Sequence, residues 1–423
     1  MASGPLAGIR VLEFTQIIAG PFGCMMLADQ GAEVIKVEPP GGEPWRLFAQ
    51  FIPLESKVFQ SLNRGKQSLV LSASDERAQE IVHRLIPTVD VVVINYRPDV
   101  AARLHIDYES LAKIKPDLIY IDVTAFGRNG PWAQRPGYDI VVQGVSGLMA
   151  GDAKVAPDGR PEQVTATAIA DYATGLAIAW AVTSALFHRE RTGEGQLVEA
   201  TLLATALAFQ GSAVMELPAA DETLRNPLRK RRRELKAAGA SYVDMLAVAR
   251  TQRVAPNIYY RTYRTSDGAV VVGALSQSLW AKVRKALGPE FLGSADPNYD
   301  VTNSEYMAWA AAQVATIEAD VASKTTAEWL AIFEREGVPV GPVNFSDEMS
   351  EDPQVLANNL MVDLEHELSG PQRMVGPILK FHKSPMQAQG AAPVLGRDTT
   401  HWLREIGYSE DEIATLYADG VVG

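Results

Sequence analysis

The amino-acid sequence predicts an α/β protein whose main part is a doubly wound parallel sheet. Between residues 1 and 130, short apolar runs rich in β-branched residues alternate with segments of helical spacing. The runs are apolar at successive positions, which is typical of strands buried on both faces. Strands that alternate with helices in this way form a parallel sheet with helices packed on either side. The segments after the runs are rich in Gly, Pro and hydrogen-bonding side chains, which indicates a binding rim.

Each element of the sheet rests on its own run of residues. Strands are expected at 9–14 (IRVLEF), 33–37 (EVIKV), 68–72 (SLVLS), 90–96 (DVVVINY) and 118–123 (LIYIDV). Residues 75–86 (DERAQEIVHRLI) have apolar positions three and four apart and predict a helix. Ligands of open parallel sheets gather at the carboxyl ends of the strands, which here lead into residues 15–21, 38–42, 95–98 and 124–127.

A smaller α/β region is expected after residue 211. Residues 228–239 (LRKRRRELKAAG) form a basic helical run with its charges concentrated at 229–233. We interpret it as a solvated helix face; contact with phosphates or with a nuclear import receptor is the alternative, but no aromatic residues interleave to stack on bases. Residues 259–275 predict a hairpin around a Ser-Asp-Gly turn. Helical patterns follow at 278–288, 305–319 and 327–337.

The composition limits the classes of partner. A chain of 423 residues is long enough for two or three domains, and its formal net charge of −12 opposes binding to nucleic acid or to anionic membranes. The apolar stretch 172–187 comes nearest to a membrane span and is interpreted as a buried helix. Cys24, the one cysteine, excludes an internal disulfide, fits a reducing compartment and is expected to be a small core residue. No secretory signal is visible, so a cytoplasmic location is expected.

Several common catalytic patterns are missing from the sequence. The six histidines show neither metal-ligand spacing nor an HExxH pattern, so no metal site is expected. No G-x-G-x-x-G follows the first strand, no phosphate-binding G-x-x-x-x-G-K-[ST] loop occurs, and 144–148 (GVSGL) is not a nucleophile elbow. What remains is a sheet rim able to hold an anionic, nucleotide-like ligand without a dinucleotide fingerprint.

Asp171 is the unusual residue of the chain. It precedes the apolar stretch 172–187, and no acidic, basic or metal-ligating side chain follows until His188. Because aspartate is preferred at helix N-caps, a plain cap is one interpretation and a reactive carboxylate is the other. The two are compatible, since the free amides of a helix start would favour the ionised form of the carboxyl. The residues around Asp171 do not decide between them.

A set of motifs, in order along nearly the whole chain, carries a resemblance. They are 6–46 (LAGIRVLEFTQIIAGPFGCMMLADQGAEVIKVEPPGGEPWR), 61–71 (SLNRGKQSLVL), 95–98 (NYRP), 137–149 (GYDIVVQGVSGLM), 192–203 (TGEGQLVEATLL), 337–344 (GVPVGPVN) and 393–399 (PVLGRDT). Each is weak alone, but together they are specific, and the sequence resembles the family III CoA-transferases (the CaiB/BaiF family).

This resemblance implies an architecture. A large Rossmann-like domain would be built from both chain ends, residues 1–211 and 326–423, with a linker and a smaller α/β domain at 212–325. The resemblance also implies a homodimer whose two subunits are interlocked like the links of a chain.

The resemblance further implies a reaction and its residues. The family nucleophile is an aspartate that opens a helix, in a stretch that matches 168–178 (AIADYATGLAI), so Asp171 is the expected catalytic residue. CoA would pass from an acyl-CoA thioester to a free carboxylic acid through an aspartyl anhydride and an aspartyl-CoA thioester, with CoA as substrate and no tightly bound cofactor. Gln16 and Ile17 match family positions at the reaction centre, and Tyr138 and Asp139 match a pair beside the nucleophile. Positions that hold the CoA nucleotide are matched or adjoined by Asn95, Tyr96, Arg97 and Arg103.

The sequence departs from the family pattern in two places. Some members carry a Gly-rich loop over the nucleophile, but residues 251–265 contain no glycine, so no lid is assigned. Some members have an arginine after the second strand, where this chain has Pro39 and Pro40. Arg46 or Lys66 is expected to replace that phosphate contact.

The 2-methylacyl-CoA racemases share the fold and are the alternative function. They pair a histidine, at the position of Tyr138, with an aspartate at the position of Asp171 as acid and base. Tyrosine, with a reference pKa of about 10, is a poor replacement for a base that works near neutrality, so Tyr138 favours the transferase. A non-catalytic CoA-binding protein would be favoured only if Asp171 were missing. A succinyl-CoA donor with a dicarboxylate or aromatic acceptor is the expected substrate pair.

Overall fold

The computed structural model describes residues 4–152, 154–223, 225–250, 257–288 and 303–423, which form two compact units. Unit 1 combines Met1–Ala219 with Pro353–Gly423, and unit 2 comprises Ala220–Asp352. The chain therefore leaves unit 1 once and returns to it. Both crossings come later in the chain than the boundaries expected from sequence, after residue 211 and before residue 326.

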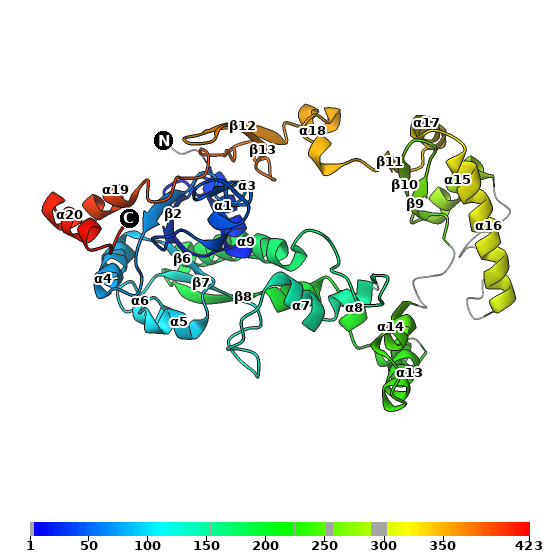
Figure 1. Cartoon of the computed structure of the whole chain (residues 1–423), viewed down its shortest axis with the longest axis horizontal. Helices are drawn as coiled ribbons and strands as arrows, with labels where there is room; N and C mark the ends of the chain where they lie inside the picture. Colours follow the sequence, from blue (N-terminus) through cyan, green and yellow to red (C-terminus); the bar gives the residue numbers. More distant parts are fainter. Residues whose placement is uncertain (1–3, 153, 224, 251–256, 289–302) are drawn as a thin grey trace. The chain divides into compact units, whose positions relative to one another are not determined.

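Unit 1 is built on a parallel sheet of six strands (Figure 1). In spatial order they are β5 (Gln67–Val70), β2 (Glu33–Glu38), β1 (Arg10–Phe14), β6 (Val91–Ile94), β7 (Ile119–Thr124) and β8 (Gln196–Thr201). All neighbours are parallel, and Leu12 at the centre lies opposite Ile35 on one side and Val92 on the other. The five predicted strands are confirmed. The sixth, β8, is missed because Glu199 interrupts its apolar run.

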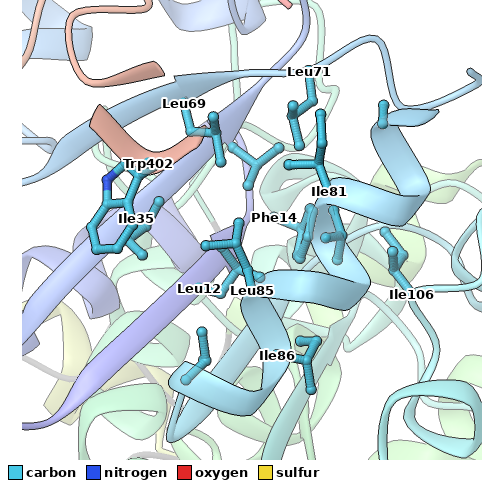
Figure 2. Packing of buried hydrophobic residues seen from close by; sticks show 14 of the residues in the cluster. Leu12, Phe14, Ile35, Leu69, Leu71, Ile81, Leu85, Ile86, Ile106 and Trp402 are labelled. Atoms are coloured by element: carbon cyan, nitrogen blue, oxygen red, sulfur yellow. The ribbon is translucent and has the colours of Figure 1, made fainter. Parts of the chain in front are cut away.

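Successive residues of each strand point to opposite faces of the sheet, and a hydrophobic core lies on each face. On one face Leu12 packs with Ile81 of α4 (Glu76–Leu85) and with Trp402 of α19 (Thr399–Glu405), as Figure 2 shows. On the other face Val11 packs with Ile178 of α9 (Ile169–Thr192) and with residues of α1 (Ala19–Asp29). The doubly wound arrangement predicted from sequence is therefore present.

Helix α9 has one buried face and one exposed face. Within the described part of the chain, it is the one helix long and apolar enough to cross a membrane, judged by length and composition alone. Its inner face, with Ile178 and Val182, is buried against α1 and the sheet, as in the core helix that the sequence predicts. Its outer face exposes Leu176, Trp180 and Phe187.

The remaining elements of unit 1 are mostly short. They are α2 (Pro44–Leu47), β3 (Gln50–Ile52), β4 (Glu55–Ser56), α3 (Lys57–Gln60), α5 (Pro98–Arg103), α6 (Tyr108–Leu111), α7 (Asp139–Val145), α8 (Leu148–Asp152), α10 (Leu202–Ala208), α11 (Gly211–Val214), α18 (Pro353–Ala357), β12 (Met361–His366), β13 (Gly370–Val375) and α20 (Glu410–Ala418). A further helix, α12 (Pro218–Asp221), spans the boundary to unit 2.

Residues near the C-terminus cover the edge strand β5. The backbone N–H of Ser68 donates to Asp398 (2.8 Å), and that of Val70 donates to Thr399 (3.1 Å). Leu71 forms an antiparallel bridge with Val422. Edge strands carry unpaired backbone groups that attract other chains, and these contacts satisfy them within the same molecule.

Unit 2 contains the predicted hairpin. Strands β9 (Tyr260–Arg264) and β10 (Ala269–Gly273) are antiparallel around the Ser-Asp-Gly turn, and β11 (Val340–Pro342) pairs with β10. Helix α17 (Thr326–Glu336) buries Trp329 and Phe333 in the same core. Because α17 and β11 complete this core, the return to unit 1 comes at residue 353. The other helices are α13 (Arg225–Ala237), which carries the exposed basic run, α14 (Tyr242–Arg250), α15 (Gln277–Leu287) and α16 (Ser304–Ala322).

Candidate active site

A pocket of about 330 Å³ lies at the carboxyl ends of β1, β6 and β7 in unit 1. From β1 the chain winds outward through β2 to β5, and from β6 it winds the other way through β7 to β8, so β1 and β6 flank the point where the winding reverses. Open α/β sheets bind their ligands at this point. The lining contains Gln16, Ile17, Ile18, Ala19, Asn95, Tyr96, Arg97, Val100, Val123, Thr124, Ala125, Pro136, Gly137, Tyr138, Asp171 and Leu202. Of the residues expected at the reaction centre, along the CoA nucleotide and beside the nucleophile, Arg103 and Asp139 are outside this lining.

Two glycines let helices α1 and α9 cross closely beneath the pocket. A Cβ added to Gly23 would lie 2.9 Å from the carbonyl oxygen of Gly175, and one added to Gly175 would lie 3.0 Å from that of Ala19. The first distance is shorter than real Cβ contacts and the second is tighter than nearly all of them, so a side chain at either position requires its neighbours to move. Gly23 lies about one turn after the start of α1, and Gly175 lies nearly two turns after the start of α9. The crossing therefore brings both first turns, with Ala19 and Asp171, to the same pocket.

Asp171 is not the N-cap of α9. The cap residue is Ala168, and Asp171 is the third residue of the helix. Two of the free backbone amides of this helix start are taken by Asp139 of α7, whose Oδ1 accepts hydrogen bonds from the N–H of Ala170 (2.7 Å) and of Asp171 (3.3 Å). The plain-cap interpretation of Asp171 is therefore wrong.

The electrostatic surroundings of Asp171 differ from those expected at a free helix start. Only 8% of Asp171 is exposed, and no described residue donates a hydrogen bond to its carboxyl oxygens. Burial, and then the negative charge of Asp139, raise the pKa of Asp171 to about 7. The expectation that helix amides keep this group ionised is thus corrected, because Asp139 occupies those amides. A carboxylate with few hydrogen bonds is more basic and hence more nucleophilic than an ordinary aspartate.

The loop after β1 is held rigidly against the pocket. Ile17 has a φ of 73°, which is strained for a β-branched residue, and its N–H donates to Glu43 (2.7 Å). Lys36 lies fully buried beneath this loop, with its Nζ 2.9 Å from Glu43 and 2.8 Å from the carbonyl oxygen of Thr15. Glu43 is a site residue that the sequence analysis misses. The sequence offers no local signal for it, because its partner Ile17 lies 26 positions away.

Asn95 also acts on this loop. Its Oδ1 accepts from the N–H of Gln16 (3.1 Å) and its Nδ2 donates to the carbonyl oxygen of Gln16 (2.9 Å). Asn95 was expected along the CoA nucleotide. In the structure Asn95 lines the pocket, and both ends of its side-chain amide fix the backbone of Gln16.

The other predicted residues differ in their access to the pocket. Tyr96 is half-buried against Phe14, and burial raises its pKa. Arg97 is exposed at the pocket and paired with Asp99 (2.8 Å); among the described lining residues it is the one cation and Asp171 the one carboxylate. Arg103 is exposed at the end of α5, outside the lining. Tyr138, 59% exposed, caps the start of α7 and lines the pocket.

Comparison with known proteins identifies the family. Residues 6–399 match CoA-transferase family III. The chain is 34% identical over 422 residues to the succinyl-CoA:glutarate CoA-transferase of Mus musculus, covering 99% of this chain and 90% of that protein. It is 34% identical over 412 residues to the succinate–glutarate CoA-transferase of Agrobacterium fabrum, covering 95% and 96%. The crystal structure of a CAIB/BAIF family protein from Brucella suis superimposes with a TM-score of 0.73 at 30% identity, covering 96% of this chain and all of that one.

The chain belongs to CoA-transferase family III. The resemblance noted in the sequence is therefore confirmed, and the protein is an enzyme of the transferase class. Within the part of the chain that the structure describes, no group of three or more His, Cys, Asp or Glu side chains is placed to hold a metal ion.

Two expectations about the family site are corrected, and one lies outside the described residues. Arg46 and Lys66 were expected to contact a phosphate, but both are fully buried. Arg46 pairs with Glu38 (2.7 Å), and Lys66 pairs with Glu13 (2.8 Å), so these cations stabilise the fold. The segment in which the sequence lacks the Gly-rich lid is 251–265, and residues 251–256 of it lie outside the part that the structure describes. Cys24 is buried, and burial raises the pKa of its thiol, so it lies in the core as the sequence predicts.

Proposed function

We propose that this family III enzyme transfers CoA from an acyl-CoA thioester to a free carboxylic acid, with Asp171 as the covalent nucleophile. The observation that carries the proposal is the placement of Asp171. It is the one carboxylate among the described residues of the pocket lining, it is buried, and its pKa is raised to about 7. CoA enters as a substrate, and the proposal requires no tightly bound cofactor, nucleic acid or membrane. We place the enzyme in the cytoplasm.

The reaction proceeds through two kinds of acyl-enzyme. A carboxylate oxygen of Asp171 attacks the donor thioester, the C–S bond breaks, and an aspartyl anhydride and CoA thiolate form. The thiolate attacks the aspartyl carbonyl, which releases the donor acid and leaves CoA on Asp171 as a thioester. The acceptor carboxylate attacks this thioester, giving a second anhydride and free thiolate. The thiolate then attacks the acceptor acyl carbonyl, which releases the new acyl-CoA and restores the carboxylate of Asp171.

The start of α1 supplies donors for the oxyanions of these steps. The first backbone N–H groups of a helix have no partner within it, and Ile18 and Ala19 at the start of α1 line the same pocket as Asp171. The N–H of Ile17 is not available, because it donates to Glu43. We assign this helix start, with Gln16 beside it, to the stabilisation of the developing negative charge.

We further propose succinyl-CoA as the donor and a dicarboxylic acid of the glutarate type as the acceptor, with an aromatic acid as the alternative acceptor. Two relatives that match almost the full chain are named for succinyl and glutarate CoA transfer. Arg97 provides a cation at the pocket for the second carboxylate of such a substrate, or for a CoA phosphate. A matrix of acyl-CoA donors and free acids, read by mass spectrometry, distinguishes these acceptors.

The racemase of the same fold has less support. Such an enzyme needs a base opposite Asp171, where this pocket presents the largely exposed Tyr138. The relatives from Mus musculus and Agrobacterium fabrum are both named as CoA-transferases.

We propose that the working form is an interlocked homodimer. Two features support it: the chain leaves unit 1 and returns to it, and α9 exposes Leu176, Trp180 and Phe187, with Trp180 75% exposed. A second copy of the chain would bury this face. Light scattering that found a stable monomer at micromolar concentration would contradict the dimer.

The covalent mechanism is tested by trapping the acyl-enzyme. Incubation with succinyl-CoA alone should load Asp171, and hydroxylamine should convert it to a hydroxamate visible as a mass change on its peptide. Asp171→Asn should keep succinyl-CoA binding and lose turnover by several orders of magnitude, because the amide cannot form the anhydride. Asp158→Asn, at an exposed turn, is the matched control and should retain full activity. Near wild-type turnover in Asp171→Asn, with deamidation excluded, would refute the assignment.

A further inference from the structure

Gln143 of α7 is fully buried and uses both ends of its side-chain amide. Its Nε2 donates to Oδ2 of Asp139, and its Oε1 accepts from the backbone N–H of Val164 (2.9 Å). Asp139 lies four positions before Gln143, so both side chains project from the same face of the helix. The buried amide therefore links α7 to the segment that leads into α9.

The other oxygen of Asp139 completes a continuous line of contacts to the nucleophile. Oδ1 accepts from the N–H groups of Ala170 and Asp171, at 2.7 and 3.3 Å. The line runs from Val164 through Gln143 and Asp139 to the first turn of α9. With hydrogen bonds at both oxygens, the Asp139 carboxylate has one orientation, and Gln143 fixes the side that faces away from Asp171.

The orientation of Asp139 decides what the Asp171 carboxylate meets. As placed, Asp139 occupies the helix amides that would otherwise be free to bind Asp171, and it puts a negative charge next to that residue. If Asp139 turned away, the amides would be released and the charge would move off. Both changes favour an ionised Asp171 of ordinary basicity.

We propose that Gln143 is a positioning residue for the reaction, which holds Asp139 on the first turn of α9 and thereby keeps the Asp171 carboxylate weakly hydrogen-bonded and strongly nucleophilic. This inference rests on the proposed function, in which Asp171 is the nucleophile. Gln143 itself is outside the pocket lining, so it is expected to act through Asp139 and not by contact with substrate.

The other charged groups on elements packed against α9 are accounted for. Asp29 of α1 pairs with Arg64 (2.6 Å), and Asp122 of β7 pairs with Arg128 (2.9 Å). Glu199 of β8 is exposed, and α10 carries no charged residue. On α9 itself, Tyr172 neighbours the nucleophile, and burial raises the pKa of its phenol. Asp139 is thus the charged group whose movement would change Asp171.

The test measures how fast succinyl-CoA loads Asp171 in a single turnover, as a function of pH. Wild type should show an acid limb with a midpoint near 7. In Asp139→Asn the midpoint should fall by about 1 unit, because a neighbouring like charge is removed while burial, the larger cause of the raised pKa, remains. Gln143→Met, which keeps the volume but removes both hydrogen bonds, should move it in the same direction by less. The rate at which Gln143→Met is loaded at high pH should fall about tenfold or more, because Asp139 and the first turn of α9 are no longer held in one position around the nucleophile. The Kd for succinyl-CoA should stay within about twofold, because Gln143 contacts no ligand.

A matched control and a second variant keep the test decisive. Gln210 follows α10, and its side-chain amide donates to the carbonyl of Ser146, the residue after α7 (3.1 Å), and to that of Ala206 in α10 (3.0 Å), without touching Asp139. The pH profile of Gln210→Met should therefore superimpose on that of wild type. Gln143→Glu should behave like wild type at low pH, where a protonated carboxyl donates and accepts as the amide does, and should lose rate at high pH as it ionises beside Asp139.

The two levels of the hypothesis fail differently. If wild type never loads Asp171, the proposed function is wrong. If wild type loads Asp171 and folded Gln143→Met shows the same rate and midpoint, the positioning role is overturned. Should Gln143→Met not fold, a Gln143→Glu profile identical to wild type at every pH would overturn it equally.

Discussion

Replacing the nucleophile should make the protein more stable, and the gain should grow with pH. Asp171 is buried with no hydrogen-bond donor among the described residues, so its ionised form is costly in the folded state. Its carboxyl titrates at 3.8 when exposed and at about 7 when folded. Between these values the folded state holds a proton that the unfolded state has released, so the contribution of Asp171 to stability declines as pH rises through this window and is constant above it.

The size of this effect follows from the shift. At about 1.4 kcal/mol per pKa unit, the raised pKa of Asp171 lowers the stability of the fold by about 4 kcal/mol at pH 8, where the folded state holds the ionised carboxylate. At pH 5 it lowers the stability by about 2 kcal/mol, because folding then has to protonate a carboxyl that is ionised in the unfolded chain. Asp171→Asn removes this titration and keeps the shape of the side chain. The variant should therefore exceed wild type in stability by an amount that increases from pH 5 to pH 8.

Calorimetric melting at fixed protein concentration, from pH 5 to pH 8, measures the difference. Fixed concentration matters because dissociation of an oligomer makes the midpoint depend on concentration. Asp158→Asn is again the matched control, since the pKa of Asp158 is lowered by hydrogen bonds from Arg160 and its loss should give no gain that grows with pH. A difference between Asp171→Asn and wild type that stays flat or shrinks as pH rises would refute the raised pKa.

Three further outcomes are expected. Arg97→Ala should raise the KM for succinyl-CoA more than it lowers kcat. Arg103→Ala should change the KM less, because of these two arginines only Arg97 lines the pocket. Equal effects of the two variants on the KM in steady-state assays would contradict this. Glu43→Gln should lower the free energy of urea unfolding by about 3 kcal/mol, because it leaves two buried cations, Lys36 and Lys66, to share the one carboxylate of Glu13. It should also lower kcat, and unchanged unfolding would count against the loop support. In D₂O, mass spectrometry should find no enzyme-dependent deuterium at the α-carbon of a 2-methylacyl-CoA, whereas rapid incorporation that needs Asp171 and Tyr138 would favour the racemase.

The sheet and the place of the pocket could be predicted because both depend on local patterns. The apolar runs mark the strands, and polar residues at the strand ends mark the rim. The pairs that decide electrostatics are not local. Asp139 binds the start of α9 from 31 positions away, and Arg46 reaches the carbonyl of Pro393 across 347 positions. A sequence pattern shows that Arg46 is charged and near the rim, but not that its partners bury it.

The assignment of Asp171 shows the same division. The sequence shows that Asp171 stands alone before an apolar helix. Whether Asp171 caps that helix depends on which carboxylate accepts hydrogen bonds from the free amides of the helix start. Asp139 does so from α7, and Gln143 behind it has no distinguishing sequence pattern. Three-dimensional contacts were needed to separate the residue that caps from the residue that reacts.

The covering of β5 by residues near the C-terminus has a consequence for biosynthesis. Asp398, which pairs with the N–H of Ser68, is made 330 positions after it. At about 5–20 residues per second, a ribosome needs roughly 20–60 seconds to bridge this interval. During that time the sheet can form from β1 to β8, but the outer edge of β5 stays open and Trp402 has not yet reached its core. The nascent chain therefore exposes an unpaired strand edge, which can pair with other chains, throughout the synthesis of unit 2. During this time the edge has to be covered by chaperones or by a neighbouring nascent copy.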